Sequence, residues 1–401
     1  MEDPEYVHIK ITDIPEEFIF EYGLAGKDDI NGWIYFEICR GCYGLPQAGI
    51  LANNLLREQL EEEGYYKAHS TPGLWKHKWR PIQFCLIVDD FGIEYMGIKH
   101  FNHLSTLLKK YHQIQTNMAG NKIAGINVQW DFPSQRVCID MQTYIDTLLL
   151  TLDWPKPQKP QLSPFIATPI AYGQKTQLTP KEDTSATLSP ECLLHVQKII
   201  GLLLYYARAG DNKLLVALNA IAARQSKATI HTKQLVHTLL DYMATYPNDG
   251  IVYRASDMVL CAHADASYLN KTKSRSRAGA HIYLSEDDPI PRFNGAVLTI
   301  ATIIKFVMAL AAEAELAALF IAARKMVPHR QTLIDMGWPQ PRSPIQSNNS
   351  TAMQSGLQTR PSSPKSQNDG HDTVVAAMSW LPETVSLLLG CRVKELGRLQ
   401  Y

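Results

Sequence analysis

The chain has 401 residues, of which 45% are hydrophobic and 19% are charged, so it is long enough for two or three domains with buried cores. Its 39 Lys and Arg residues balance 39 Asp and Glu residues, which excludes an overall positive field and leaves nucleic-acid binding to local basic patches. Seven scattered cysteines, no signal-peptide pattern and no apolar run long enough for a membrane span lead us to expect an intracellular protein, in cytoplasm or nucleus, without membrane association.

The first part of the chain mixes strand and helix patterns. In chain order, the expected elements are a strand at 33–39, a helix at 48–65, a strand at 83–88, a helix at 100–111, and paired strands at 122–132 and 136–141. We therefore predict a mixed α and β domain over residues 1–152. Residues 153–192 are rich in Pro, Gln, Lys, Ser and Thr, which predicts a linker or an extended strap.

The second part changes from helices to an α/β pattern. Three helices are expected at 196–210, 214–225 and 232–246, followed by strands at 259–264, 278–285 and 296–303 and a helix at 308–325. Regular patterns end after Pro341. We assign a helical connection to 193–250, an α/β domain to 251–355 and a poorly ordered tail to 356–401, for an overall α+β or α/β fold class.

Two adjacent carboxylates, Asp89 and Asp90, follow an apolar run and Val88, where a β-hairpin tip is expected. Aspartates are common in turns, so a plain surface turn is one interpretation. The other is a metal site, because Mg²⁺ prefers oxygen ligands and two ions about 4 Å apart stabilise the attacking and leaving oxygens of phosphoryl transfer.

A turn rich in glycine, Gly41-Cys-Tyr-Gly-Leu-Pro-Gln-Ala-Gly49, precedes the first long helix. In this order and spacing, the turn and Val88-Asp89-Asp90 resemble the reverse transcriptases of copia-type retrotransposons. The resemblance covers roughly residues 1–355. It also includes Thr71-Pro-Gly-Leu-Trp-Lys-His77, Leu203-Leu-Tyr-Tyr-Ala-Arg-Ala209 and Leu215-Val-Ala-Leu218. It implies a partial reverse-transcriptase palm and thumb over 1–152, with RNA, DNA, RNA–DNA hybrid and deoxynucleoside triphosphates as partners.

The resemblance implies roles for three residues of the polymerase part. Gln47 would lie near the incoming nucleotide and template, and Asp89 and Asp90 would bind catalytic Mg²⁺. The family's site also needs a third carboxylate from an earlier strand, and we expect this chain to begin just downstream of that strand; Asp3 and Asp13 lie in stretches that resemble the family's segment after the strand. Two carboxylates without the third should bind metal poorly.

A second acidic pair lies in the α/β domain. Asp265 ends a strand pattern, and Glu313 and Glu315 lie on the later helix, in an arrangement that resembles a ribonuclease H domain of the same elements. There, a strand aspartate and a helix glutamate bind two Mg²⁺ ions that direct water onto an RNA phosphodiester. Residues two apart on a helix point about 200° apart, and the family's register selects Glu315. Ordinary exposed carboxylates are the alternative.

Two further acids of that family site do not carry over. Asn348 stands where the third aspartate belongs, and an amide oxygen brings no negative charge to a metal. For the fourth, the codons of Asp369-Gly-His-Asp372 can spell the family's Met-Asp-Met one nucleotide out of frame. We therefore hypothesise a frameshift between about Ser355 and Asn368, which the DNA sequence would test.

A run of four cations, Lys271, Lys273, Arg275 and Arg277, lies between two expected strands. A solvated loop is one interpretation, and contact with a nucleic-acid backbone is the other. Three functions remain open: an Mg²⁺-dependent polymerase and nuclease with little or no activity, a non-catalytic nucleic-acid-binding remnant, and an unrelated soluble α/β binding module. We favour a reverse-transcriptase-derived protein with little or no activity, because acids are missing from both sites.

Overall fold

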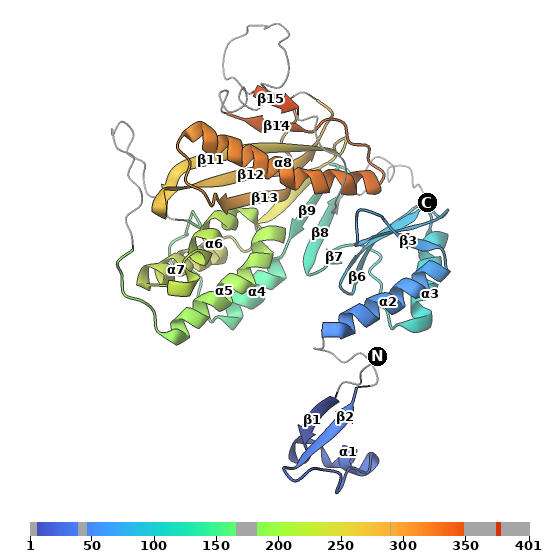
Figure 1. Cartoon of the computed structure of the whole chain (residues 1–401). Helices are drawn as coiled ribbons and strands as arrows, with labels where there is room; N and C mark the ends of the chain where they lie inside the picture. Colours follow the sequence, from blue (N-terminus) through green and yellow to red (C-terminus); the bar gives the residue numbers. More distant parts are fainter. Residues whose placement is uncertain (1–5, 39–45, 166–182, 289, 349–373, 378–401) are drawn as a thin grey trace. The chain divides into compact units, whose positions relative to one another are not determined.

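The computed structural model describes residues 6–38, 46–165, 183–288, 290–348 and 374–377 (Figure 1). These residues form two compact units: residues up to 66 together with 77–80, and residues 67–76 together with those from 81 onward. Helices and several sheets alternate along the chain, so the predicted mixed α and β class is confirmed. Within the described ranges, no helix is long and apolar enough to cross a membrane.

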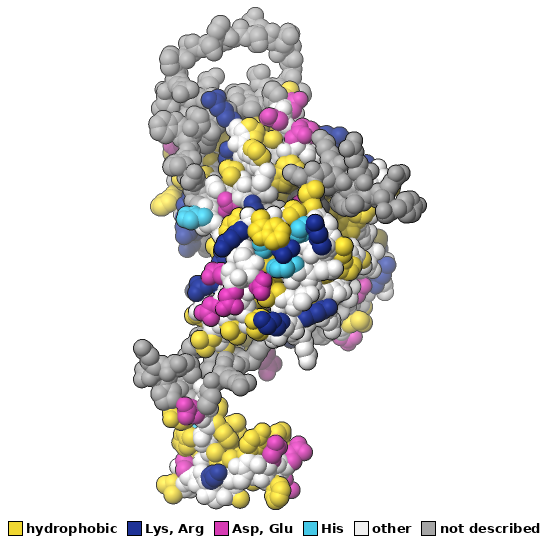
Figure 2. Space-filling view, turned by 90° about the vertical axis from the view of Figure 1, so that its right-hand side faces the viewer, with side chains coloured by type: hydrophobic (Ala, Val, Ile, Leu, Met, Phe, Trp, Pro, Cys, Tyr) yellow, Lys and Arg dark blue, Asp and Glu magenta, His cyan; other side chains and the backbone are white. Residues whose placement is uncertain are grey.

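The first unit begins with a small two-stranded ribbon. Its elements are β1 (Tyr6–Lys10), the short helix η1 (Ile11–Asp13), α1 (Glu16–Glu21), β2 (Trp33–Glu37) and α2 (Pro46–Glu62). Over residues 6–38 the buried hydrophobic side chains are Leu24 and Ile34, whereas Phe20 is 91% exposed. Figure 2 shows hydrophobic side chains gathered on the surface of this segment. Two buried hydrophobic side chains do not make a sizeable core, and a two-stranded ribbon is marginally stable by itself.

A four-stranded sheet follows, with the order β3-β4-β5-β6. Its strands are β3 (Tyr65–Lys67), β4 (Leu74–His77), β5 (Ile82–Ile87) and β6 (Asp90–Tyr95). Trp75 of β4 pairs with Phe84 of β5, and both side chains are buried. Helix α3 (Ile98–Tyr111) comes next and buries Leu104, Leu107 and Leu108. The strand and helix expected at 83–88 and 100–111 are confirmed.

A second antiparallel sheet has the order β10-β9-β8-β7. Its strands are β7 (Lys122–Ile123), β8 (Ile126–Asp131), β9 (Arg136–Asp140) and β10 (Gly250–Arg254). The predicted pairing of 122–132 with 136–141 is confirmed, with Trp130 opposite Val137. Strand β10 was not predicted, and it joins β9 across the boundary expected at residue 250, with Gly250 opposite Asp140.

A helical layer comes after these strands, built from α4 (Gln142–Thr151), α5 (Pro190–Ala209), α6 (Leu215–Ala222) and α7 (Ile230–Thr245), with the short helices η2 (Asn212–Leu214) and η3 (Gln225–Lys227). Two starts are capped: Ser189 accepts a bond at α5, and Thr229 with Thr232 forms a capping box at α7. The three predicted helices are confirmed. Helix α4 was not predicted, and Ile145 and Leu148 join the same buried core.

The proline-rich segment is described over 153–165 and 183–192. Its first part runs along the helices as a strap, because Trp154 Nε1 donates to Asp241 at 3.0 Å and the Gln161 amide donates to Thr245 Oγ1 at 3.1 Å. Trp154 also packs against the helical core. Of the two expectations, linker or strap, the described residues 154–161 match the strap.

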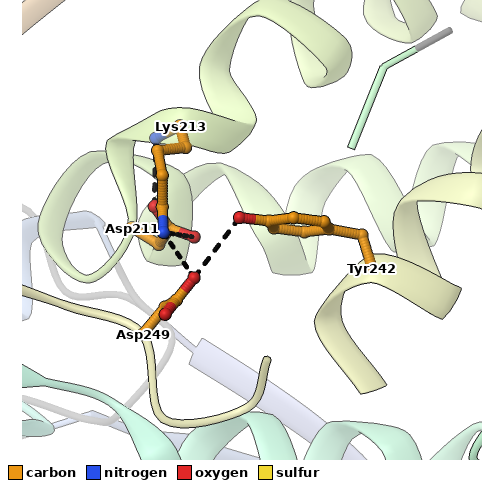
Figure 3. A network of polar contacts seen from close by, with 4 residues as sticks. All are labelled: Asp211, Lys213, Tyr242 and Asp249. Carbon is orange, nitrogen blue, oxygen red and sulfur yellow. Dashed lines mark hydrogen bonds and ion pairs between the residues drawn. The ribbon is translucent and has the colours of Figure 1, made fainter. Parts of the chain in front are cut away.

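An ion-pair network fastens the turn after α5 to the segment before β10 (Figure 3). Lys213 pairs with the buried Asp211 at 3.8 Å and with Asp249, and Tyr242 of α7 donates to Asp249 at 3.3 Å. Burial raises the pKa of Asp211, and Lys213 opposes that shift. The network therefore ties the helical layer to the sheet that β10 completes.

The last sheet has the order β13-β12-β11-β14-β15, and α8 covers one of its faces (Figure 1). Its elements are β11 (Val259–Lys271), β12 (Arg275–Ser285), β13 (Ala296–Ile303), α8 (Ala311–Asp335), β14 (Pro344–Ser347) and β15 (Val374–Ala377), with η4 (Thr272–Ser274) between β11 and β12. The three predicted strands and the helix are confirmed. Regular structure does not end at Pro341 as expected, because β14 pairs with β11 in parallel. Within the tail expected from 356, β15 pairs with β14.

Candidate functional site

The Asp89–Asp90 pair lies at the tip of the β5–β6 hairpin, as the sequence predicts. Ile87 pairs with Asp90, so Val88 and Asp89 form a two-residue loop. Val88 has φ of 56° and is 92% exposed. A β-branched residue in this region is strained, so the pairing of the two flanking strands must hold the loop in place.

Asp90 also holds a neighbouring loop. Its Oδ2 accepts a hydrogen bond from the Ala124 amide at 2.8 Å, in the two-residue turn between β7 and β8. On the other side, Tyr205 Oη donates to the Ala124 carbonyl at 2.6 Å. Burial and the negative charge of Asp90 raise the pKa of Tyr205. Tyr205 belongs to the segment 203–209 that carries the family resemblance, and its contact gives that segment a structural role beside the aspartates.

The hairpin borders a cavity of about 760 Å³ inside the second unit. Asp89 and Asp90 lie on its wall, with Trp130 of β8 and Arg254 of β10 among the other lining residues. Gln47, which the sequence places with the aspartates, belongs to the first turn of α2, and its side chain is outside the described residues.

The second predicted pair is brought together by strand and helix. Asp265 is on β11 and Glu315 is in the first turns of α8, where it is 8% exposed. Burial, the negative charge of Asp265 and a hydrogen bond with that carboxyl raise the pKa of Glu315 to about 7. Glu315 Oε2 is buried and has no hydrogen-bond partner in the part of the chain that the structure describes. Two carboxyls facing each other in this way favour a bound cation.

Glu313, the other candidate on the helix, is exposed and accepts a bond from the Ala309 amide at 2.8 Å. It therefore stabilises the turn before α8. The opposite roles of Glu313 and Glu315 follow from the helical periodicity.

Asn348 directly follows β14. Strands β11 and β14 are parallel, with Ala262 opposite Ile345 and His263 opposite Gln346, and Asp265 and Asn348 each lie two residues beyond the second of these pairs. The segment 369–372, expected to supply the fourth acid, is outside the described residues. Among the described residues, no three His, Cys, Asp or Glu side chains form a metal-binding group.

Two side chains that the sequence analysis missed position this site. Gln340 donates to the Met258 carbonyl at 2.8 Å and accepts from the Leu260 amide at 3.0 Å, which aligns the approach to β14 with the start of β11. Arg330 near the end of α8 donates to the carbonyls of Gln340 and Pro341. No sequence pattern marks either residue, because their partners are backbone atoms.

The four predicted basic residues do not form one exposed row. Lys273 and Arg275 are exposed, Lys271 is half-buried beside Phe165, and Arg277 is 6% exposed. Arg277 Nη1 donates to the Val216 carbonyl of α6 at 3.1 Å. Arg277 does not lie in the exposed loop because it belongs to β12, and the strand directs its side chain toward the helical layer.

Comparison with known proteins finds a weak similarity to a transposon protein. No protein-family profile matches the chain. The yeast protein named "Putative transposon Ty5-1 protein" (Saccharomyces cerevisiae) is 24% identical over 240 residues, which are 58% of this chain and 72% of the yeast protein. This weak similarity supports a retrotransposon origin for the chain.

Proposed function

We propose that the chain derives from the reverse transcriptase and ribonuclease H part of a copia-type retrotransposon polyprotein, and that its α/β domain binds RNA–DNA hybrid with little or no cleavage. The observation that carries this proposal is the Asp265–Glu315 pair, with Asn348 directly after the strand β14 that pairs with β11. The similarity to the yeast transposon protein supports the origin, and the quoted motifs support the finer assignment.

The donor set fits Mg²⁺ only in part. The unpartnered Glu315 Oε2 and the facing Asp265 carboxyl are suitable oxygen ligands, and Asn348 would add a neutral amide oxygen. Two Mg²⁺ ions, when bound, supply charge stabilisation for phosphodiester cleavage. With one acid replaced by an amide, we expect weak ion binding and little activity.

A cleavage assay tests the proposal. A hybrid with a labelled RNA strand is incubated with the full chain and Mg²⁺, beside Asp265→Asn and Asn348→Asp variants. We expect little cleavage by the natural chain, more by Asn348→Asp, and none when Asp265→Asn is added to Asn348→Asp. Robust cleavage by the natural chain that Asp265→Asn removes would contradict the predicted inactivity.

Hybrid binding separates the proposal from the remaining alternative, an unrelated binding module. Binding to phosphates weakens steeply with salt, so the affinity for the hybrid should fall between 50 and 200 mM salt. A folded chain that shows no hybrid binding at low salt would overturn the proposed family function, whatever its cleavage activity.

RNA-directed DNA polymerisation is the second function that the resemblance implies. It would use Asp89 and Asp90 as metal ligands, Gln47 near the template and deoxynucleoside triphosphates as substrates. Asp90 already accepts the Ala124 amide, so a metal there would share a carboxylate with a structural hydrogen bond. We expect no primer extension on an RNA template, and extension that Asp89→Asn abolishes would contradict this.

A further inference from the structure

Helix α8 begins without the usual side-chain cap. Its N-cap residue, Leu310, has an extended backbone, and its side chain makes no capping hydrogen bond. The backbone amides of a first helical turn have no partner within the helix, so other contacts must fix where the helix starts. Glu315 follows Leu310 by five residues and is buried. The position of this helix start therefore determines where Glu315 lies.

The residue before the N-cap, Ala309, is held on both sides. Its carbonyl accepts a hydrogen bond from Tyr268 Oη at 2.6 Å, and its amide donates to Glu313 Oε2 at 2.8 Å. Tyr268 belongs to β11, three residues after Asp265. Glu313 belongs to α8, two residues before Glu315. A single residue thus joins the strand that carries one carboxyl to the helix that carries the other.

Strand β11 is irregular where Tyr268 lies. Its pairing with β12 shifts register between Ser267 and Lys271, and Leu269 between them has φ of 48°. The Leu269 amide donates to Ser276 Oγ at 3.0 Å, which holds the irregular stretch in place. Bulges of this kind redirect side chains and are common next to active sites. The irregularity therefore belongs to the same arrangement as the bond from Tyr268 to Ala309.

The ring of Tyr268 packs close to the place where its hydroxyl bonds. It lies against a cluster whose buried members are Ala278, Ile304, Ala314 and Ala318. Ala314 and Ala318 are four residues apart on α8, so they lie on one face of the helix. Ala314 is fully buried and directly precedes Glu315. Ring and hydroxyl thus both act on the start of α8.

We propose that Tyr268 and Glu313 are positioning residues: acting through Ala309, they hold the start of α8 so that Glu315 and Asp265 can share one bound cation. Neither residue would touch the ion itself. The cation rests on the proposed function, whereas the anchoring of the helix start stands on the two hydrogen bonds. Partners of metal ligands fix the orientation of those ligands, and losing one lowers metal affinity by about 10- to 100-fold.

The first test measures the rise in Tm of the full chain as MgCl₂ replaces NaCl at constant ionic strength, since an ion that binds the folded state stabilises it. Tyr268→Phe and Glu313→Ala should each weaken Mg²⁺ binding by about 10-fold or more. Glu313→Gln should bind like the natural chain, because its amide oxygen can still accept the Ala309 amide. Lys213→Met, which disturbs a different network, should lower the Tm in EDTA and leave the Mg²⁺ affinity unchanged.

A double variant tests whether both residues act through Ala309. Two bonds to the same residue are coupled, so Tyr268→Phe combined with Glu313→Ala should weaken Mg²⁺ binding little more than the more severe single variant does. Losses that multiply in the double variant would overturn the shared path through Ala309.

Hydrogen exchange in EDTA follows the helix start without metal. Amides of residues 309–316 should exchange faster in Tyr268→Phe and Glu313→Ala, and those near Thr332 at the far end of α8 should not change. Unchanged exchange at 309–316, or faster exchange with unchanged Mg²⁺ affinity, would overturn the positioning role. A natural chain whose Tm does not respond to Mg²⁺ would overturn the cation, and with it the positioning role. That failure of the proposed function is seen before any variant is made.

Discussion

The carboxyls of Asp265 and Glu315 face each other although they come from a strand and from a helix that begins far along the chain. Glu315 is buried and its Oε2 has no partner among the described residues, so protein groups alone satisfy the pair poorly. A proton or a cation can relieve this repulsion. The competition between the two determines how stability should respond to pH and to Mg²⁺.

In metal-free buffer, the stability of the fold should fall as pH rises from about 4.5 to about 7 through Glu315. Its folded-state pKa is raised from 4.5 to about 7, so the folded state retains a proton that the unfolded state releases. This stabilisation is fully present below the pKa that Glu315 has in the unfolded chain, and it is lost above the pKa that Glu315 has in the folded protein. It contributes at most about 3 kcal/mol to the free energy of unfolding. Urea unfolding across this range measures it.

Glu315→Gln should remove that part of the pH dependence and make the protein more stable than the natural chain at pH 8. Glu313→Gln is the matched control, because Glu313 is exposed on the same helix and an amide oxygen can still accept the Ala309 amide. Parallel pH profiles for the natural chain and Glu315→Gln would contradict the burial argument.

Asn348→Asp should increase the affinity for Mg²⁺. Residues 265 and 348 each lie two residues beyond the last recorded pair of β11 and β14, so we expect the new carboxylate to join the Asp265–Glu315 pair. Without metal, the variant should be less stable than the natural chain, because a third negative charge adds repulsion. With Mg²⁺ the order should reverse, and the rise in Tm with Mg²⁺ concentration measures the affinity. A response equal to that of the natural chain would mean that residue 348 does not contact the ion.

Local patterns predicted most of this fold where they were long enough. The β-prone run at 296–303 is β13 to the residue, and the long helical pattern lies within α8. Strand β14 has only four residues, and it exists because Ile345 pairs with Ala262, far away in sequence. Strand β10 likewise depends on β9. Such pairings are tertiary contacts, which no periodicity within the strand encodes.

In the candidate site, too, some residues are marked by the sequence and others depend on tertiary contacts. The resemblance selected Asp265 and Glu315, and the structure brings them together. The sequence of 271–277 is typical of an exposed basic loop, yet Arg277 is buried because α6 supplies a carbonyl to it from 61 residues away.

Lys213→Met should destabilise the protein by about 1 to 3 kcal/mol at neutral pH, because it leaves the buried Asp211 without a charge partner. The value is below that for a fully buried pair, since the Lys213 side chain is 51% exposed. The loss should shrink in acid, where protonated Asp211 needs no partner. Lys198→Met on the exposed side of α5 is the control and should change stability little. An equal loss at every pH would show that the charge of Asp211 is not the cause.

Gly250→Ala should destabilise the protein by about 1 to 3 kcal/mol, as overpacking does in well-packed regions. A Cβ at this position would lie 2.4 Å from the Ile139 carbonyl oxygen, which is backbone and cannot move aside without breaking the β9–β10 pairing. Gly201→Ala on α5 provides the matched contrast, because nothing lies within 4 Å of the place that its new methyl group would take and alanine favours helix by about 1 kcal/mol. Chemical unfolding of both variants should therefore give opposite signs. Equal, small effects would mean that β10 shifts easily, and its pairing with β9 would then be weaker than the network around Lys213 suggests.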